Sequence, residues 1–598
     1  MSYDELKQHP GAEPFERITV YLDACSRVFS VSPCTATGEP CFNTWETCRD
    51  RPNYARVDKP ISFCTATASM PSNLTDIPFL SGGTRGAVRE RSGEPDPMRG
   101  LGRRGSISVS LIDAVHDDVG IDPYVSSRSY DPMERGTFYP KLKARFPYWK
   151  SRVIEWESGY IDPDDGLYYP ANFQKKTYII DSTSYRRGSW GISAKDPLRL
   201  ADDKLSKMPR PSRGVLAEAL AEDASPTTID IATPDDTEYA FESFETFSAV
   251  RIGRQVFKYT GTTPITGGVR LTGVTRTLDD GYVTDTEDHD IDDEVQKCLW
   301  FRAMPSIEIV KTALESFADV PSEWIPYADW LDEYTTWQAG FTMTRLITEP
   351  EGVKAAIEEI IQQSGTWAYW WDPIAAKIRW SPIRPPDIGE IYPALSDRDN
   401  LVGDSVERKD EPEKLINEYY VLFGQRDPTR KRDETSNYRA VILGANQASQ
   451  SVNEDGEVKT ETVYGRWHTA ASRANLLSII ATMIKTSAGI PFTVEFYLHK
   501  KDDAIKTSEF VTMESLAILN EFGNPADVRL RVVRGAVNGQ QVKYKAVQDF
   551  FRGRFGRIAP ADLSGLLYSA ATEAQKAEYV FIADADGLID GEDGYELL

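Results

Sequence analysis

Short stretches of alternating or continuous hydrophobic residues recur along this chain, and turn-forming residues separate them. Alternation places every second side chain on the same face, as in a half-buried β-strand. The intervening Gly, Pro, Asn and Asp residues are typical of turns. The four clearest predicted strands span residues 106–113, 177–184, 268–276 and 528–535.

Stretches with the spacing of a helix are fewer. In them, apolar residues recur three and four positions apart, which places them on one face of a helix. We expect helices within residues 195–208, 214–223, 306–318, 349–365 and 469–487. The sequence therefore predicts a mainly β protein with scattered helices (α+β), and its length of 598 residues predicts several domains.

The composition is that of a folded, acidic protein. Hydrophobic residues make up 40% of the chain and aromatic residues 11%, which argues against disorder. Lys and Arg number 68 and Asp and Glu number 92, so the formal net charge is −24. Because contacts with phosphate need a cationic face, this charge argues against a general nucleic-acid-binding protein.

The sequence shows no sign of export or membrane insertion. No apolar run reaches the roughly 18 residues of a transmembrane helix. Residues 1–20 lack the basic region and apolar run of a signal peptide. We therefore expect synthesis in the cytoplasm, where thiols stay reduced.

Motifs of the common enzyme classes are absent from the sequence. None of the five histidines stands in HExxH spacing, and no GxSxG, Walker A or strand-linked GxGxxG motif occurs. With 92 acidic residues, some pair of carboxylates always lies near a cleft, so such pairs carry no information. We expect that the protein is not an enzyme.

Four cysteines, Cys25, Cys34, Cys41 and Cys48, lie close together near the N-terminus. Thiols this close commonly bind zinc, bind an iron–sulfur cluster or form disulfides. The CxxC spacing of most zinc ribbons is missing, so zinc stays open but is not favoured. A chain of this length does not need disulfides to build its core. We interpret the group as a metal centre that holds a loop-rich segment.

Two further cysteines have simpler interpretations. Cys64 follows an apolar run, and we expect a strand that buries it as a small hydrophobic residue, with a role as alternate ligand left open. Cys298 stands beside Leu299 and Trp300, and we expect a buried structural thiol.

Acidic residues gather at 280–293 and at 584–598. Such runs can chelate calcium, but both lack the ligand positions and the glycine of an EF-hand loop. We interpret the first as a solvated acidic loop and the second as an acidic terminal hairpin.

Several segments carry specific residue motifs, which the overall composition does not reveal. They lie at residues 41–54, 104–118, 130–160, 192–209, 346–386, 413–429, 464–477 and 551–560. Together they resemble the tail-hub proteins (tail-tip or baseplate-hub proteins) of long-tailed bacteriophages, of the iron–sulfur-containing type. The most specific pieces are RGTF at 135–138, the Lys-Asp pair at 195–196 and the cysteine segment.

The resemblance implies a structural virion protein. Such a hub is a homotrimeric ring that closes the distal end of the tail tube, is built from tube-like β-barrel domains and forms a channel for DNA and the tape measure. The implied partners are the distal tail or tail-tube protein, the tape measure protein and tail fibre or receptor-binding proteins, while DNA passes without specific binding. The implied location is the tail tip of the virion.

The resemblance also implies a cofactor. A [4Fe-4S] cluster would be held by Cys25, Cys34, Cys41 and Cys48, with zinc as the alternative metal and Cys64 as an alternate ligand. Its role would be either to fix a segment that has too few apolar residues to fold alone or to act as a redox trigger, and we favour the first.

Composition and resemblance together suggest four parts. Residues 1–100 would hold an N-terminal strand, the cysteine-rich metal segment (21–60) and a Gly-, Arg- and Pro-rich loop (82–104) at the boundary. Residues 101–225 would form the first tube-like hub domain, 226–410 the middle hub domains, and 411–598 a C-terminal hub domain with an acidic tail. The alternative function is a tail-associated enzyme, either a cell-wall hydrolase or a metal-dependent catalyst.

Overall fold

The computed structural model describes most of the chain. The described residues are 2–9, 11–65, 70–81, 87–96, 100–232, 248–384, 392–452, 457–487, 491–502, 504–538, 541–549, 554–555, 571–572, 588–589, 592–593 and 595–596. The segment 551–560 and the acidic tail at 584–598 lie for the most part outside these residues.

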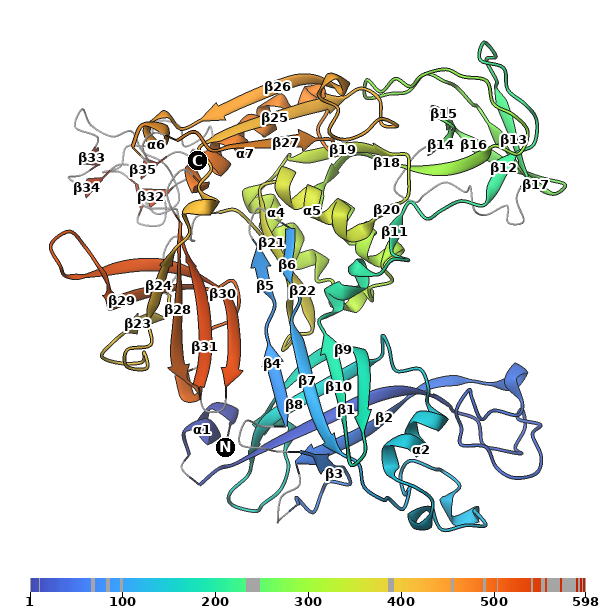
Figure 1. The fold of residues 1–598 in the computed structure, drawn as a ribbon, viewed down its shortest axis with the longest axis vertical. Helices are drawn as coiled ribbons and strands as arrows, with labels where there is room; N and C mark the ends of the chain where they lie inside the picture. Colours follow the sequence, from blue (N-terminus) through green and yellow to red (C-terminus); the bar gives the residue numbers. More distant parts are fainter. Residues whose placement is uncertain are drawn as a thin grey trace.

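An eight-stranded sheet forms the lower part of the molecule in Figure 1. Its order is β10-β9-β8-β1-β2-β3-β7-β4, and β10 also pairs with β7, so hydrogen bonds join the two ends of the path from β10 to β7. Alternate side chains such as Ile18, Val20 and Phe63 fill its core. The strands are β1 (Glu13–Cys25), β2 (Arg56–Thr65), β3 (Ile77–Leu80), β4 (Val88–Arg91), β7 (Ser106–Ile112), β8 (Val153–Ile161), β9 (Phe173–Arg186) and β10 (Ser189–Lys195).

Strands β1 and β2 form a long antiparallel pair that carries the cysteine segment at its end. The register pairs Val20 with Ile61 and, at the far end, Cys25 with Arg56. Figure 1 shows the two strands running together toward the right, where a loop-rich extension joins them. The helices of this part are α1 (Tyr3–Gln8) and α2 (Phe138–Arg145), and a small hairpin of β5 (Glu94–Asp96) and β6 (Gly100–Arg103) rises from it.

A second sheet lies at the upper right of Figure 1, with the order β15-β14-β18-β12-β13-β17-β16, and β19 pairs with β18. Ile231, Val250 and Phe257 lie in its core. Its strands are β12 (Gly214–Leu216), β13 (Thr228–Ala232), β14 (Ser248–Ile252), β15 (Gln255–Tyr259), β16 (Gly261–Ile265), β17 (Gly268–Thr272), β18 (Glu294–Pro305) and β19 (Thr342–Ile347).

Helices gather in the centre of the molecule (Figure 1). Ile357, Ile360 and Ile361 of one helix are buried on a single face, as the helical spacing requires. Trp330 is buried in the same core and donates its ring N–H to the Ile378 carbonyl at 3.0 Å. The elements are α3 (Ser306–Thr312) with a π-helical turn (Ala313–Phe317), α4 (Tyr327–Trp337), α5 (Val353–Gln363), the hairpin β21 (Thr366–Asp372) and β22 (Lys377–Pro382), and the pair β11 (Lys207–Met208) and β20 (Glu351–Gly352).

Two further sheets follow toward the C-terminus. The sheet β26-β25-β27 packs one face against α7, and the sheet β23-β29-β30-β31-β28-β24 has its own core. Their elements are β23 (Ala394–Ser396), β24 (Glu407–Asp410), β25 (Glu418–Gln425), β26 (Tyr438–Ala445), α6 (Gln447–Val452), β27 (Thr460–Gly465), α7 (Arg473–Ser487), β28 (Phe492–His499), β29 (Phe510–Leu519), β30 (Pro525–Asn538) and β31 (Gln541–Gln548). Short pairs join β32 (Arg554–Phe555) to β35 (Tyr595–Glu596) and β33 (Leu588–Ile589) to β34 (Glu592–Asp593).

Most elements predicted from the sequence are present. The four predicted strands correspond to β7, β9, β17 and β30. The helices predicted within 306–318, 349–365 and 469–487 are confirmed as α3 with its π-helical turn, α5 and α7. The protein is mainly β with several helices and multiple sheets, as the pattern of strands predicted.

Two helix predictions and one loop prediction are wrong. The stretch 195–208 forms only a 3-10 helix at Pro197–Asp202, followed by β11. The stretch 214–223 begins with β12, which pairs with strands on both sides, and this pairing overrides a weak helical pattern. Within the predicted loop at 82–104, β4 pairs with β7, and β5 pairs with β6.

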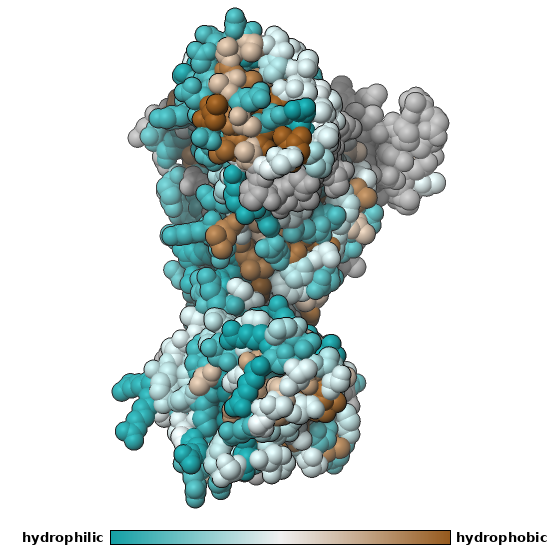
Figure 2. Space-filling model, turned by 90° about the vertical axis from the view of Figure 1, so that its right-hand side faces the viewer, coloured by the Kyte–Doolittle hydropathy of each residue, from teal (hydrophilic) through white to brown (hydrophobic). Residues whose placement is uncertain are grey.

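The surface differs between the parts of the molecule. Figure 2 shows that polar side chains cover most of the lower body, which holds the first sheet, whereas apolar side chains gather in the upper part. Among the described residues, no helix is both long and apolar enough to cross a membrane.

A buried carboxylate joins several of these parts. Glu359 on α5 accepts hydrogen bonds from Arg345 of β19 at 3.1 Å, from Arg432 at 2.8 Å and from Arg466 at 2.6 Å. Burial alone would raise the pKa of Glu359, but the charges of Arg345 and Arg466 and these hydrogen bonds lower it to about 2. The network connects the helical centre to the second sheet and to the chain around β26 and β27.

We expect Glu359→Gln to destabilise α5 and its neighbours by roughly 3 kcal/mol at pH 7, because the buried Arg345 and the partly buried Arg466 must then share the carboxylate of Glu351. The depressed pKa means that the carboxylate's contribution is complete above the unfolded value, about 4.3, and is lost as the pH falls toward 2. The measurement is amide hydrogen exchange of α5 across this pH range.

Glu315→Gln is the matched control, since Glu315 of the π-helical turn Ala313–Phe317 lies 3.5 Å from Lys311 of α3 in a partly exposed pair. It should change the stability by less than about 0.5 kcal/mol. Equal effects of the two substitutions at pH 7 would contradict a special role for Glu359.

Candidate metal centre

The cysteine segment, residues 26–55, is held by turns and polar contacts, and its one regular element is the 3-10 turn Arg51–Asn53. The Cys25 N–H donates to the Asn43 carbonyl at 2.7 Å, and the Ser26 N–H donates to the Ala55 carbonyl at 2.9 Å. Ala36 and Thr44 are the buried side chains of the segment. The segment therefore lacks an apolar core of its own.

The four clustered cysteines line a single small pocket within this segment. Cys25 is the last residue of β1, whereas Cys34, Cys41 and Cys48 lie in the turns that follow. All four are half-buried free thiols. The fold thus brings together the residues that the sequence singled out.

The local electrostatics reflect this convergence. Burial raises the pKa of the Cys48 thiol, and the negative charges of Cys41, Cys25 and Cys34 raise it further. The Asp50 N–H lies 3.4 Å from the Cys48 sulfur and donates to it. A cation among the four sulfurs would offset the mutual repulsion of their thiolates.

The remaining polar groups of the pocket differ in their availability. The carboxylate of Asp50 accepts hydrogen bonds from the Thr35 N–H at 2.7 Å and from the Asn53 side chain at 3.1 Å, so it is already engaged. The Tyr54 hydroxyl oxygen is buried and has no hydrogen-bond partner. The residues that line the pocket are therefore rich in sulfur donors and include Tyr54, whose hydroxyl is unpaired.

Arg128 fastens the cysteine segment to the body of the protein. Its guanidinium donates to the carbonyls of Pro40 and Cys41 and pairs with Asp122 at 2.8 Å, with both side chains almost fully buried. It also lies 3.9 Å from the centre of the Phe42 ring. Because these bonds hold the backbone of Cys41, Arg128 positions one of the four thiols.

The other two cysteines lie elsewhere. Cys64, on β2, is fully buried among Phe15, Tyr168 and Phe173, and burial raises the pKa of its thiol to about 12. Cys298 is buried on β18, where burial likewise raises the pKa of its thiol. Both are buried thiols, as the sequence predicted. Neither lines the four-cysteine pocket.

Within the described ranges, no group of three or more His, Cys, Asp or Glu side chains is arranged to hold a metal ion. These ranges include the cysteine segment and residues 280–293. Assignment of Cys25, Cys34, Cys41 and Cys48 as ligands, and of Cys64 as an alternate, stays a prediction.

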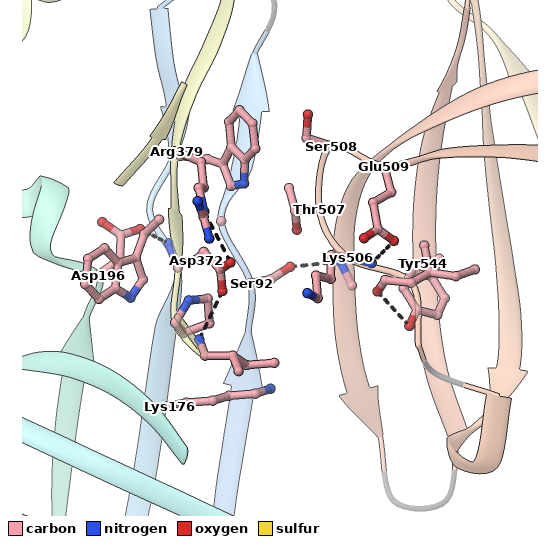
Figure 3. Close-up of a pocket in the computed structure, with 18 of the residues that line it drawn as sticks. Ser92, Lys176, Asp196, Asp372, Arg379, Lys506, Thr507, Ser508, Glu509 and Tyr544 are labelled. Carbon is pink, nitrogen blue, oxygen red and sulfur yellow. Dashed lines mark hydrogen bonds and ion pairs between the residues drawn. The ribbon is translucent and has the colours of Figure 1, made fainter. Parts of the chain in front are cut away.

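A larger cleft of about 460 Å³ lies between the first sheet, the β21–β22 hairpin and the sheet of β30 and β31. Figure 3 shows its charged groups facing one another. Lys176 pairs with Glu90 at 2.5 Å, Arg379 lies 3.5 Å from Asp372, and the Gly535 N–H donates to Ser92 at 2.8 Å. The first two pairs lie within the first sheet and within the β21–β22 hairpin, whereas the bond from Gly535 to Ser92 crosses the cleft and makes it a polar seam between parts of the fold.

Asp196, one of the residues in the sequence resemblance, lies at this seam. It is 3% exposed, accepts a hydrogen bond from the Gly105 N–H and precedes the 3-10 helix Pro197–Asp202. Burial raises its pKa to about 6. The neighbouring Lys195 pairs with Asp181 at 2.9 Å. Both residues therefore lie directly before the 3-10 helix and make local polar contacts.

Comparison with known proteins gives structural similarity alone. No family model and no curated protein matches the chain. Solved structures of phage tail proteins align with about three quarters of the chain, with TM-scores below 0.4. These include the prophage tail protein gp18 from Listeria monocytogenes EGD-e (8% identity, TM-score 0.33, 78% of this chain and 89% of that chain). They also include the tail protein from Neisseria meningitidis MC58 (10% identity, TM-score 0.36, 77% and 96%).

We expect Arg128→Lys to loosen the cysteine segment by roughly 2 kcal/mol, because lysine cannot reproduce the bonds to two carbonyls and Asp122 together. Limited digestion with trypsin measures this, since Arg27 and Arg49 are exposed cleavage sites within the segment. Arg135→Lys is the control, because Arg135 is exposed and stacks loosely on Tyr130 at 5.6 Å. Cleavage of Arg128→Lys at the wild-type rate would contradict the assigned role.

Proposed function

We propose that this chain is a structural protein of a bacteriophage tail, the trimeric hub at the distal end of the tail tube, and that Cys25, Cys34, Cys41 and Cys48 hold a [4Fe-4S] cluster. The observation that carries the proposal is the convergence of these four cysteines on one pocket. The sequence segments that resemble tail-hub proteins, spread over most of the chain, supply the context.

The side chains of the pocket fit an iron–sulfur cluster. Cysteine thiolates are the usual ligands of such clusters, and four of them face one space while the nearest carboxylate is engaged. When bound, the cluster would supply four metal–sulfur bonds that cross-link the chain at positions 25, 34, 41 and 48.

The proposed role of the cluster is structural. The cysteine segment buries only Ala36 and Thr44, so its own side chains contribute little hydrophobic stabilisation. Binding of a metal group to residues far apart in a loop contributes directly to folding free energy. The cluster would therefore replace the missing core of this segment, and the protein would have no catalytic activity.

The hub role is supported by the topology and the charge. In the first sheet the edge strand β10 also pairs with β7, which suits a tube-like barrel that continues the wall of a tail tube. Three copies would meet through heterologous contacts that close into a ring. A net charge of −24 suits a channel through which DNA slides without binding.

Metal analysis and mass measurement test the proposal together. Protein purified without oxygen should show a broad visible absorption band, contain about four irons and four sulfides per chain, and sediment as a trimer. Colourless protein with one zinc would replace the cluster by a zinc site, and a metal-free monomer that clears peptidoglycan would overturn the hub assignment in favour of an enzyme.

We expect Cys41→Ser to lower the bound iron several-fold and to impair assembly into tails, because serine removes one of four ligands. Cys64→Ser is the matched control, since Cys64 lies in a separate core. It should retain iron close to the wild-type level, so loss of iron from Cys64→Ser would show that Cys64 is a ligand. Infectious tails at normal yield from Cys41→Ser would contradict the structural role.

A further inference from the structure

Tyr54 lines the pocket of the four cysteines and lies near the C-terminal end of the cysteine segment. It directly follows the 3-10 turn Arg51–Asn53, and its N–H donates to the Arg51 carbonyl at 3.1 Å. Its ring packs edge-on against Trp45, with the ring centres 5.1 Å apart. The backbone and the ring are therefore fixed by neighbours within the segment.

The hydroxyl of Tyr54, in contrast, has no partner. Its oxygen is buried and forms no hydrogen bond with the described residues. Buried hydroxyl groups are normally hydrogen-bonded, because leaving one unpaired costs about 1–3 kcal/mol. The oxygen belongs to a residue that lines the same pocket as the four thiols. An unpaired donor at this position indicates a bound group that accepts a hydrogen bond.

The charges around the hydroxyl point to a sulfur acceptor. Burial raises the pKa of Tyr54 to about 12, and the negative charges of Cys25, Asp23 and Cys48 contribute. The phenol thus keeps its proton at neutral pH, and the negative charge around it favours donation of this proton in a hydrogen bond. Asp23 pairs with Arg56 at 2.7 Å and with Arg152, whereas Cys25 and Cys48 line the pocket with Tyr54.

We propose that the Tyr54 hydroxyl donates a hydrogen bond to a sulfur of the group held by Cys25, Cys34, Cys41 and Cys48. This inference rests on the proposed cluster and adds a fifth side chain to its site. Hydrogen bonds to the sulfurs of an iron–sulfur cluster are among the determinants of its reduction potential, because they stabilise the more negative, reduced state. Tyr54 would therefore raise the potential and slow the loss of iron.

Tyr54→Phe isolates this hydrogen bond. Phenylalanine keeps the ring contact with Trp45, and the substitution removes no hydrogen bond within the described protein. In anaerobically purified full-length protein, we expect wild-type iron content, a midpoint potential shifted to a more negative value, and release of iron to a chelator about tenfold faster. The metal-free variant should unfold at the wild-type temperature or above it, because no partner is lost.

Tyr124→Phe is the matched control. The Tyr124 hydroxyl accepts a hydrogen bond from the Phe29 N–H at 2.7 Å, and Tyr124 packs on the same segment without lining the pocket. It should lower the stability of the segment with and without iron and leave the potential unchanged.

The outcomes separate the two proposals. Absence of iron from the wild-type protein would overturn the proposed cluster and with it this hydrogen bond. Normal iron in the wild type combined with an unchanged potential and unchanged iron release in Tyr54→Phe would overturn the hydrogen bond alone. If Tyr54→Phe fails to take up iron, the unfolding temperature of the metal-free variant decides between two roles. A temperature equal to that of the metal-free wild type supports the hydrogen bond, whereas a lower temperature overturns it in favour of a packing role.

Discussion

The centre of the molecule depends on one buried carboxylate. Glu359 takes hydrogen bonds from three arginines that come from β19, from the chain before β26 and from the chain after β27. A charge this deeply buried is stable only when its partners stay in place, because removal of one partner leaves an uncompensated ion. The helical centre, the second sheet and the sheet of β25 to β27 are thereby constrained to one arrangement, and the hydrophobic cores of these parts pack around it.

The cysteine segment, in contrast, is not held by a hydrophobic core. It projects from the end of β1 and β2, away from the cores of the sheets, and few of its side chains are buried. Arg128 ties its backbone to the body through the carbonyls of Pro40 and Cys41. Its pocket is lined by the four cysteines and by Tyr54, whose buried hydroxyl has no hydrogen-bond partner. The hydrogen bonds from Arg128 and the proposed binding of a metal group by the four cysteines thus take the place of hydrophobic packing.

Sequence patterns predicted an element well where burial on one face decided the structure. The buried positions of α5 repeat at helical spacing, and those of β7 alternate, so both were predicted. The prediction failed at residues 214–223, because the backbone of β12 pairs with β13 and β18 and this pairing is invisible in the local pattern. Helix α4 was missed as well, since only Trp330 and Tyr334 of its eleven residues are buried.

The sequence by itself determined the mainly β character of the protein, its acidity and the identity of the four clustered cysteines, because these depend on residue type and on short spacing. Only the tertiary structure decided that the four thiols share one pocket and that Tyr54 and Arg128 belong to the same site. Arg128 and Cys41 are 87 positions apart in the chain, so their contact follows from how the sheet folds and leaves no local pattern. The same reason applies to Glu359, whose partners lie 14, 73 and 107 positions away.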